Sequence, residues 1–242
     1  MIELSVLVLP DRDPAAFVAD VRAAEALGVR TVWTYDHLTW TPLKDRPWHA
    51  AVPMLAAAAV STSRVRLGTQ VATPNYRHPV TFAKEIMTLD HLSGGRLEIG
   101  VGAGAEGADA AVLGDPPRSL AERAERFAEW LDLLDHLLTH DVSTVHGPRY
   151  SAVEARQIPG CLQRPRVPLT VAATGPRAMA LAARHGQAWV TYGAYRRRDE
   201  GFHELTLHWP RPDDARGMPS GALDLVAATH QSSRRPSRKA ER

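Results

Sequence analysis

The chain has 242 residues, which suits one barrel-sized domain or two small ones. Hydrophobic residues make up 44% of it and the formal net charge is +2, so the composition argues against wholesale disorder and against a nucleic-acid-binding protein. The single cysteine, Cys161, excludes a disulfide framework or a cysteine metal cluster. No apolar run is long enough to cross a bilayer, and residues 1–4 lack the basic region of a signal peptide. We therefore expect a cytoplasmic protein with no membrane or nucleic-acid partner.

Strands and helices alternate from the first residues onward. Six apolar runs predict strands, over residues 2–9, 31–35, 64–72, 96–101, 169–173 and 188–192. Apolar side chains at helical spacing, or a run rich in alanine, predict helices over residues 14–27, 52–61, 81–92, 120–140 and 176–184. Residues 144–161 are a polar insertion, and residues 204–209 are a last apolar run. This alternation predicts an α/β fold with a parallel sheet, which right-handed crossovers curl into a barrel.

The alternating pattern stops near Pro210, so we predict a barrel domain over residues 1–210. Residues 211–242 include the polar and basic stretch 232–239, which is typical of a disordered tail. An arm that binds RNA or a membrane surface is the alternative for this segment.

Small residues follow the third and fourth predicted strands. Residues 70–74 close the third strand, and the fourth runs into Gly100, Gly102 and Gly104. Ligands of parallel α/β proteins bind outside the carboxyl ends of the strands, where small side chains let a flat or phosphorylated ligand approach the backbone. The glycine spacing differs from a dinucleotide fingerprint, and no acidic residue clearly ends a following strand, so we reject a nicotinamide site.

Asp36 and His37 follow the second predicted strand. A histidine that titrates near neutrality can accept the proton of a substrate hydroxyl while the attached carbon loses a hydride. The alternative interpretation is a pair that caps the turn after the strand. In the next loop, Trp40 and Trp48 are candidates either to stack on a ligand or to fill the barrel rim.

Residues 174–177 (Thr174, Gly175, Pro176 and Arg177) lie between a predicted strand and the helix that follows it. Free backbone N–H groups at a helix start, with a hydroxyl and a guanidinium beside them, can bind an anion such as a cofactor phosphate. Capping of the helix by Thr174 is the alternative.

Five segments at these strand ends, in order along residues 1–193, resemble the luciferase-like monooxygenase superfamily, especially its F420-dependent members. They are residues 34–37, 66–74, 89–96, 100–104 and 172–177. The resemblance implies a TIM barrel that holds a deazaflavin (coenzyme F420) or a flavin (FMN) at its carboxyl-terminal mouth. It also implies an oxidoreductase that transfers hydride with F420, or oxygen as an FMN-dependent monooxygenase, to or from a small organic substrate.

The same resemblance implies roles for individual residues. His37 faces the reactive ring of the cofactor, and the Gln70–Val71 bond matches a cis peptide that precedes no proline. Of the two loop tryptophans, Trp40 is the better candidate to contact the substrate, because it lies only a turn away from His37. Glu106 is the candidate catalytic acid, although many relatives have their glutamate one residue earlier, where this chain has Ala105. The implied cofactor-binding residues are Asp36, Gln70, Val71, Thr73, Gly102, Gly104, Thr174, Gly175, Pro176 and Arg177.

The chain departs from the family pattern near its carboxyl end. Only residues 193–203 separate the sixth predicted strand from the last, whereas a parallel crossover needs about a dozen residues or more, usually with a helix. We therefore predict an incomplete barrel that lacks one strand and its adjacent helices and leaves sheet edges exposed. Relatives often dimerise, so we expect a homodimer, and a partner chain that completes the barrel is the alternative.

Two other classes of function stay open. The short link at residues 193–203 favours a non-catalytic remnant of the family. A metal-dependent barrel hydrolase commonly places two histidines on its first strand, where residues 4–9 offer no metal ligand, so we expect no metal site.

Overall fold

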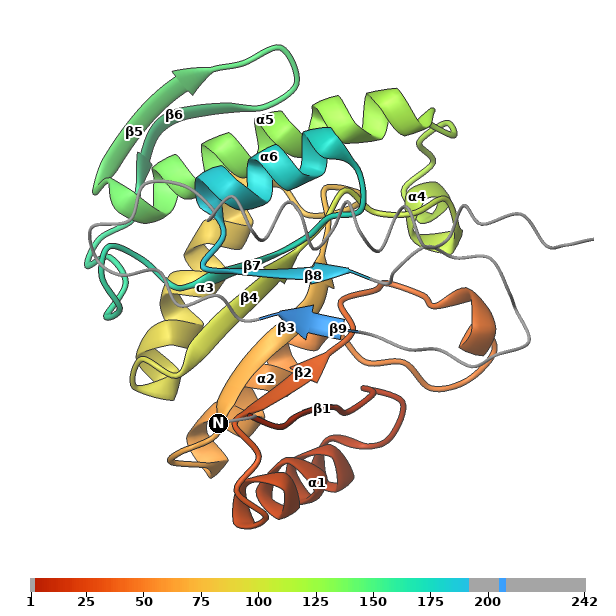
Figure 1. Cartoon of the computed structure of the whole chain (residues 1–242), viewed down its shortest axis with the longest axis vertical. Helices are drawn as coiled ribbons and strands as arrows, with labels where there is room; N and C mark the ends of the chain where they lie inside the picture. Colours follow the sequence, from red (N-terminus) through yellow and green to blue (C-terminus); the bar gives the residue numbers. More distant parts are fainter. Residues whose placement is uncertain (1–2, 192–204, 208–242) are drawn as a thin grey trace, which may run out of the picture.

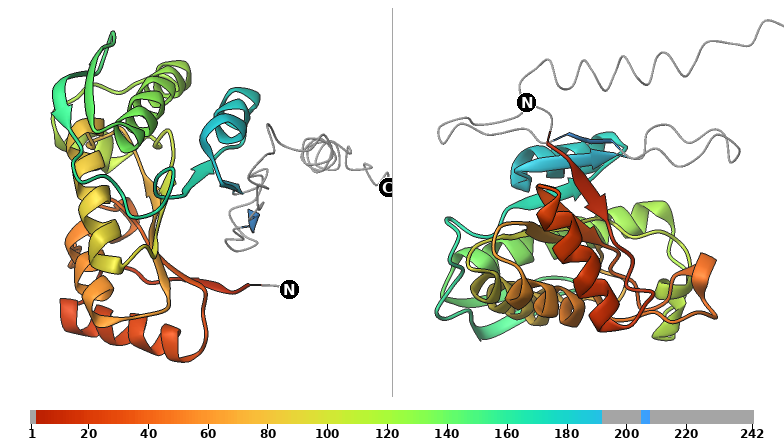
Figure 2. Two further views of the ribbon diagram at one scale, coloured as in Figure 1. Left: turned by 90° about the vertical axis from the view of Figure 1, so that its left-hand side faces the viewer. Right: turned by 90° about the horizontal axis from the view of Figure 1, so that it is seen from below.

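The computed structural model describes residues 3–191 and 205–207. They form one curved sheet with helices along its outer side, as Figure 1 and the two turned views in Figure 2 show. The predicted tail over residues 211–242 and the link at residues 193–203 lie outside the described residues. Within the described part of the chain, no helix is long and apolar enough to cross a membrane.

Six parallel strands make up most of the sheet, and each matches a predicted strand. They are β1 (Ser5–Leu7), β2 (Thr31–Thr34), β3 (Arg66–Ala72), β4 (Leu97–Val101), β7 (Leu169–Ala172) and β8 (Ala188–Thr191). Their order in the sheet is also their order in the chain, and β9 (Leu205–Leu207) follows β8 at the far edge. The sheet is therefore the curled, incomplete TIM barrel that the sequence predicts, with β1 and β9 at its two ends.

The last strand differs from a simple continuation of the parallel sheet. β9 pairs antiparallel with β8, with Thr206 opposite Val190. A parallel neighbour needs a crossover connection, usually with a helix, whereas an antiparallel neighbour can be reached by a shorter loop. Only residues 192–204 link the two strands, which favours the antiparallel pairing.

Five helices cover the convex side of the sheet. They are α1 (Pro14–Ala26), α2 (Ala51–Ser61), α3 (Pro79–Ser93), α5 (Leu120–Thr139) and α6 (Pro176–His185). Each helix packs on the next along this row, from α1 against α2 to α5 against α6. The rings of Phe82, Phe127 and Trp130 are buried and stacked. Burial of such large apolar side chains is the main driving force that holds this layer together.

Local capping fixes where several of these helices begin and end. The Asp13 side chain accepts hydrogen bonds from the first turn of α1, and Ser119 forms a capping box with Glu122 at the start of α5. Gly94 ends α3 at φ 62°, a left-handed conformation that favours glycine. Two short helices, η1 (Thr41–Leu43) and α4 (Ala108–Val112), lie in the segments that follow β2 and β4.

The polar insertion predicted around residues 144–161 contains a β-hairpin. Its strands, β5 (Val142–His146) and β6 (Ser151–Arg156), form a separate two-stranded sheet after α5. Most of their side chains are exposed, so the sequence lacks the apolar alternation of a strand with one buried face.

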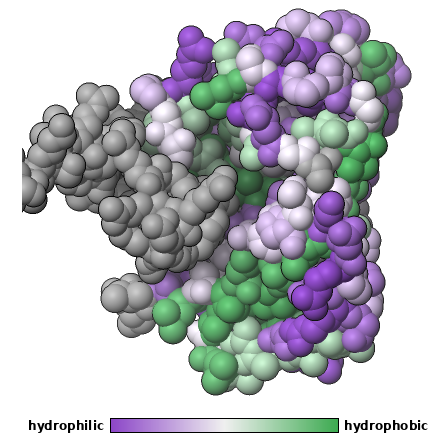
Figure 3. Space-filling view, turned by 90° about the vertical axis from the view of Figure 1, so that its right-hand side faces the viewer, coloured by the Kyte–Doolittle hydropathy of each residue, from purple (hydrophilic) through white to green (hydrophobic). Residues whose placement is uncertain are grey.

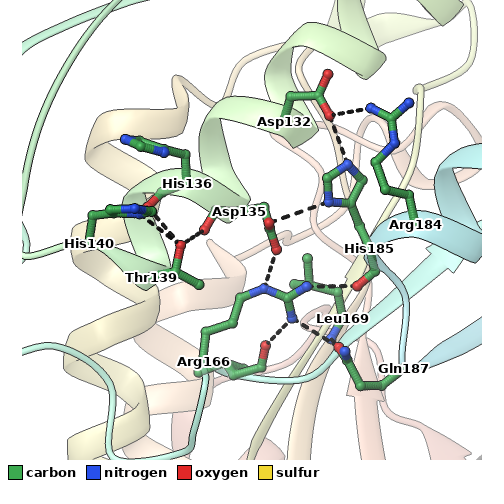
Figure 4. A network of polar contacts seen from close by, with 11 residues as sticks. Asp132, Asp135, His136, Thr139, His140, Arg166, Leu169, Arg184, His185 and Gln187 are labelled. Atoms are coloured by element: carbon green, nitrogen blue, oxygen red, sulfur yellow. Dashed lines mark hydrogen bonds and ion pairs between the residues drawn. The ribbon is translucent and has the colours of Figure 1, made fainter. Parts of the chain in front are cut away.

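An ionic network ties α5 to α6 and to the segment before β7 (Figure 4). His185 Nε2 lies 2.8 Å from Asp132 Oδ1, and His185 Nδ1 lies 3.5 Å from Asp135 Oδ2. Arg166 contacts Asp135 and donates from Nη2 to the His185 carbonyl at 2.7 Å. Burial acts to raise the pKa of Asp135, but the hydrogen bond with His185 and the charge of Arg166 outweigh it and lower this pKa to about 2. The network therefore anchors the end of α6 against α5.

Candidate active site

The carboxyl ends of the parallel strands gather at one end of the molecule, on the right in Figure 1. The predicted site residues follow these ends: His37 after β2, Thr73 after β3, Gly102 and Gly104 after β4, and Thr174 after β7. Figure 3 looks at this end and shows apolar side chains gathered in its lower part, with polar side chains beside them. Strands of one parallel sheet thus bring these distant segments to one mouth.

A carboxylate–imidazole pair lies at this mouth. Asp109 Oδ2 contacts Nδ1 of His37, and Asp109 Oδ1 accepts hydrogen bonds from the backbone N–H groups of Leu38 (2.8 Å) and Thr39 (3.0 Å). The Asp109 side chain is 6% exposed and that of His37 is 29% exposed. A carboxylate that accepts the Nδ1 proton leaves Nε2 as the acceptor of a neutral ring. Asp109 therefore fixes both the loop after β2 and the orientation of the histidine.

Sequence reasoning missed Asp109 and favoured Glu106 as the acidic partner. The Glu106 side chain is 74% exposed, and its Oε1 lies 3.3 Å from Nη1 of Arg123. Asp109 stands in the first turn of α4, and that short helix turns its carboxylate toward the β2 loop. The signal available in the sequence was an acidic residue in the first turn of a helix that follows the glycine segment. A catalytic role of Glu106 stays a prediction.

Aromatic rings surround His37. The Tyr35 ring lies edge-on to His37 with ring centroids 5.8 Å apart, and it lies 5.2 Å from the Trp40 ring. Trp48 packs 5.6 Å from Trp40, and its Nε1 donates a 3.0 Å hydrogen bond to the His37 carbonyl. The structure thus brings both loop tryptophans to the histidine, in an arrangement that suits an apolar wall beside a proton-transferring group.

Asp36 is fully buried, and both of its oxygens are bound by Arg77. Nε of Arg77 donates to one oxygen at 3.0 Å and Nη2 donates to the other at 2.7 Å, while Nη1 reaches Glu85 at 2.8 Å. Burial acts to lower the pKa of Arg77, but hydrogen bonding and the charge of Asp36 outweigh it and raise this pKa. The two hydrogen bonds from the Arg77 guanidinium to Asp36 hold the end of β2 against the segment that leads into α3.

Val71 connects three strands. The Gln70–Val71 peptide bond is cis, as the resemblance predicts, and the register between β3 and β4 shifts between Thr69 and Ala72. A Cβ added to Gly102 would lie 2.8 Å from Val71 Cγ2 and 3.3 Å from the Ala172 Cβ. Glycine is therefore required here by the packing of this chain, whereas the sequence had suggested the approach of a ligand as the reason.

Gly104 and Thr73 lie at the rim around these residues. Gly104 has φ +76°, and a Cβ there would lie 2.8 Å from the side-chain amide of Asn75. Thr73 is buried, and its hydroxyl accepts from the backbone N–H of Asn75 at 3.3 Å. Both residues thus pack on Asn75 at the ends of β3 and β4.

The start of α6 is open. Gly175 is the N-cap residue and makes no side-chain capping bond, so the capping by Thr174 that the sequence allowed is not seen. Thr174, Pro176 and Arg177 are exposed, and a Cβ on Gly175 would meet nothing within 4 Å. An uncapped helix start with a hydroxyl and a guanidinium beside it suits an anionic group.

Comparison with known proteins decides the family. The model of the luciferase-like monooxygenase family matches residues 2–242. This chain belongs to the luciferase-like monooxygenase family. That membership confirms the resemblance found in the sequence, and it speaks against the metal-dependent barrel hydrolase.

Several members of the luciferase-like monooxygenase family are similar to this chain in sequence. An F420-dependent glucose-6-phosphate dehydrogenase of Beutenbergia cavernae is 41% identical, over 73% of this chain and 52% of the relative. An F420-dependent hydroxymycolic acid dehydrogenase of Mycobacterium tuberculosis is 35% identical, over 72% of this chain and 48% of the relative. A 4-hydroxyprotoasukamycin monooxygenase of Streptomyces nodosus is 34% identical, over 70% of this chain and 46% of the relative.

Solved structures agree with the family fold. The coenzyme F420-dependent tetrahydromethanopterin reductase of Methanopyrus kandleri aligns with a TM-score of 0.67 and 25% identity, over 80% of this chain and 56% of that protein. The monooxygenase RslO1 of Streptomyces bottropensis aligns with a TM-score of 0.66 and 27% identity, over 78% of this chain and 59% of that protein. The chain spans about half the length of the curated relatives it matches, in line with the incomplete barrel.

Proposed function

We propose that the protein is an oxidoreductase that uses coenzyme F420, with FMN as the alternative cofactor. The observation that carries the proposal is the buried carboxylate of Asp109 against the ring of His37 at the strand mouth. An imidazole oriented in this way can accept or return a proton at Nε2. The similar F420-dependent dehydrogenases favour F420, and the similar monooxygenase keeps FMN as the alternative.

The residues at the mouth fit a flat cofactor with a phosphate. Val71, Gly102 and Ala172 pack together across three strands and offer an apolar contact of the kind that a planar ring requires. The open start of α6 suits a phosphate. Bound F420 would supply a carbon that accepts or donates a hydride, and reduced FMN together with molecular oxygen would supply the oxygen atom that is transferred. The residues proposed to hold the cofactor are Gln70, Val71, Thr73, Gly102, Gly104, Thr174, Gly175, Pro176 and Arg177, whereas the fully buried Asp36, with both oxygens bound by Arg77, holds the end of β2 in place.

His37 moves the proton in this proposal. A substrate hydroxyl bound at Nε2 gives its proton to the ring while its carbon loses a hydride, and the reverse reaction returns the proton. The negative charge of Asp109 stabilises the protonated ring that results. Trp40, in contact with Tyr35 and Trp48, restricts water and orients a small organic substrate. Glu106, which precedes α4, is the second candidate proton carrier.

Binding of the purified protein to F420 and, separately, to FMN tests the proposal. Cofactor fluorescence and absorbance are titrated with protein, because a ring transferred from water to an apolar wall changes both signals. We expect saturable binding of F420 and weaker binding of FMN. Binding of neither would overturn the proposal. It would favour the second candidate, a non-catalytic family member, which the antiparallel β9 supports.

A further inference from the structure

A cavity of about 180 Å³ opens beside the candidate active site. Ala105 and Asn75, at the ends of β4 and β3, form one wall of it, and Ala110 of α4 forms another. Arg118 and Arg123, at the start of α5, close the far side. The lining also includes the carboxylates of Glu106 and Asp115, so the small pocket contains two guanidinium groups and one carboxylate for each of them.

Arg123 is largely buried, and two of its nitrogen atoms make no hydrogen bond with any residue that the structure describes. Its side chain is 14% exposed, and its Nε and Nη1 atoms are inaccessible to solvent and make no hydrogen bond within the described residues. Three residues further along α5, Nη1 of Arg126 is also inaccessible to solvent and makes no hydrogen bond to the described part of the chain. The Nε atom of Arg126 donates to the Tyr150 hydroxyl at 2.7 Å. Burial of a guanidinium costs free energy unless its N–H groups meet an anion or another acceptor. An anion that took the place of Glu106 beside Nη1 of Arg123 would therefore meet a donor that makes no hydrogen bond.

Glu106 occupies the approach to these donors only loosely. Its carboxylate is 74% exposed and lies 3.3 Å from Nη1 of Arg123, and the contact lacks the geometry of a hydrogen bond. Exposed ion pairs of this kind contribute little free energy. An incoming anion can therefore displace Glu106, whose side chain is free to turn back into solvent.

Arg118, the other arginine of the cavity, has a closer ion-pair partner than Arg123 has. Arg118 donates from Nη2 to Asp115 Oδ2 at 2.8 Å, and its side chain is 24% exposed. Each arginine thus has one carboxylate partner, and the more exposed of the two partners, Glu106, is the one that an incoming anion can replace. A phosphate or carboxylate could accept two N–H bonds from the planar guanidinium of Arg123.

The pocket and the histidine lie on either side of α4. Asp109 of this helix contacts His37, whereas the next two residues, Ala110 and Ala111, line the cavity. We propose that the cavity is an anion subsite in which Arg123, assisted by Arg118, binds a phosphate or carboxylate group. That this group is carried by a ligand of the oxidoreductase rests on the proposed function, and it belongs either to the cofactor tail or to the substrate.

Inorganic phosphate tests the subsite without any cofactor. Calorimetric titration compares the full chain with the Arg123→Gln and Arg123→Lys variants. We expect the wild type to bind phosphate, Arg123→Gln to weaken binding at least tenfold, and Arg123→Lys, which keeps the charge but loses the planar fork, to fall between them. Glu106→Gln should strengthen binding a few-fold, because it removes the competing carboxylate.

Arg184→Gln is the matched control, because it removes the same charge from an exposed side chain in the last turn of α6. It should bind phosphate as the wild type does. Circular dichroism melting of every variant checks folding, and the Glu106→Gln result keeps the test decisive if Arg123→Gln does not fold. Equal phosphate affinity in the wild type, Arg123→Gln and Glu106→Gln would overturn the proposal, whether or not F420 or FMN binds.

A second comparison identifies the source of the anion. FMN is compared with riboflavin, and F420 with its phosphate-free deazaflavin core, on the wild type and on Arg123→Gln. If the subsite, rather than the start of α6, holds the cofactor phosphate, the variant weakens only the phosphorylated forms. If it holds a substrate group, the variant binds all four molecules as the wild type does and still loses inorganic phosphate.

Discussion

The side chain of Asp109 determines which ring nitrogen of His37 carries the proton. One carboxylate oxygen of Asp109 contacts Nδ1 of the His37 ring, and the other accepts hydrogen bonds from the backbone of the loop after β2. A single carboxylate therefore sets both the tautomer and the position of the ring. Because Asp109 is buried, the amide N–H groups of the loop depend on it as their acceptor. The chemistry of the site is therefore sensitive to this residue as well as to the histidine.

Replacement of His37 by alanine tests the proton carrier itself. We expect His37→Ala to abolish turnover and to leave cofactor affinity within a few-fold of the wild type, because the ring handles the proton and does not hold the cofactor. Steady-state rates and a fluorescence titration measure the two quantities. Turnover at the wild-type rate would remove His37 from the mechanism.

Replacement of Asp109 by asparagine separates positioning from folding. The amide can still accept from the loop, but it no longer stabilises a protonated ring, so we expect kcat to fall roughly 10²- to 10⁴-fold. Cofactor affinity and melting temperature should stay close to those of the wild type. Asp109→Glu, which keeps the charge, should recover part of the rate. A parallel loss of cofactor affinity in Asp109→Asn would point to a structural role only.

The sequence could predict some of these residues and not others. His37 follows a clear strand, and the cis bond before Val71 was implied by the resemblance. Asp109 contacts a residue 72 positions away through a five-residue helix, and Glu106 was nearer to the position expected from relatives. Nothing in the spacing told which of these two carboxylates turns inward, because that depends on the path of the chain after Gly104.

At the scale of elements, the α5–α6 contact depends on charge as well as on apolar packing. The folded-state pKa of Asp135, about 2, lies below its ordinary value of 3.8. A carboxyl group with a lowered pKa stabilises the fold above its ordinary pKa, and this stabilisation is lost as the pH falls toward 2. The contribution that this carboxylate loses on acidification is about 2 kcal/mol.

Acid unfolding of Asp135→Asn tests this assignment. We expect the wild-type melting temperature to fall more steeply between pH 4 and pH 2 than that of the variant, which has no carboxylate to protonate. The variant should be less stable at pH 7, since Arg166 and His185 lose a charged partner. If the melting temperatures of both proteins fell equally steeply with pH, groups other than Asp135 would be responsible for the loss of stability in acid.

Elements with one buried face were predictable, and those without one were not. The long helix α5 was predicted within one residue of its observed end because apolar side chains recur along one face. The β5–β6 hairpin was missed because most of its side chains face water. The direction of β9 could not be predicted from an apolar run alone, because the periodicity of a strand does not indicate whether its neighbour runs parallel or antiparallel.

At the scale of the whole molecule, the curved sheet ends in a strand with apolar side chains in solvent. Leu4, next to β1, is 69% exposed, and Val6 within β1 is 37% exposed. Residues 6–9 also line a groove of about 510 Å³ with Ala23 and Leu27 of the α1 region. Among the described strands β1 has a neighbour on one side only, and such an edge beside an apolar groove favours association with another chain.

We therefore propose a homodimer that uses the β1 edge. Sedimentation velocity should give a dimer for the wild type and a monomer for Val6→Lys, because a charge on an edge strand opposes pairing. Val60→Lys, which adds the same charge at an exposed apolar residue of α2, is the control and should remain a dimer. A wild-type monomer at high micromolar concentration would contradict the proposal.

The packing of Val71 against Gly102 has a consequence for protein engineering. A side chain at position 102 would collide with Val71 and crowd Ala172, so a library that varies this glycine in search of a new cofactor preference should yield mostly misfolded clones. Gly175 has ordinary backbone angles and empty space around it, so it should accept most amino acids. Diversity introduced at the α6 start would therefore reshape the binding rim while the interior of the barrel keeps its form.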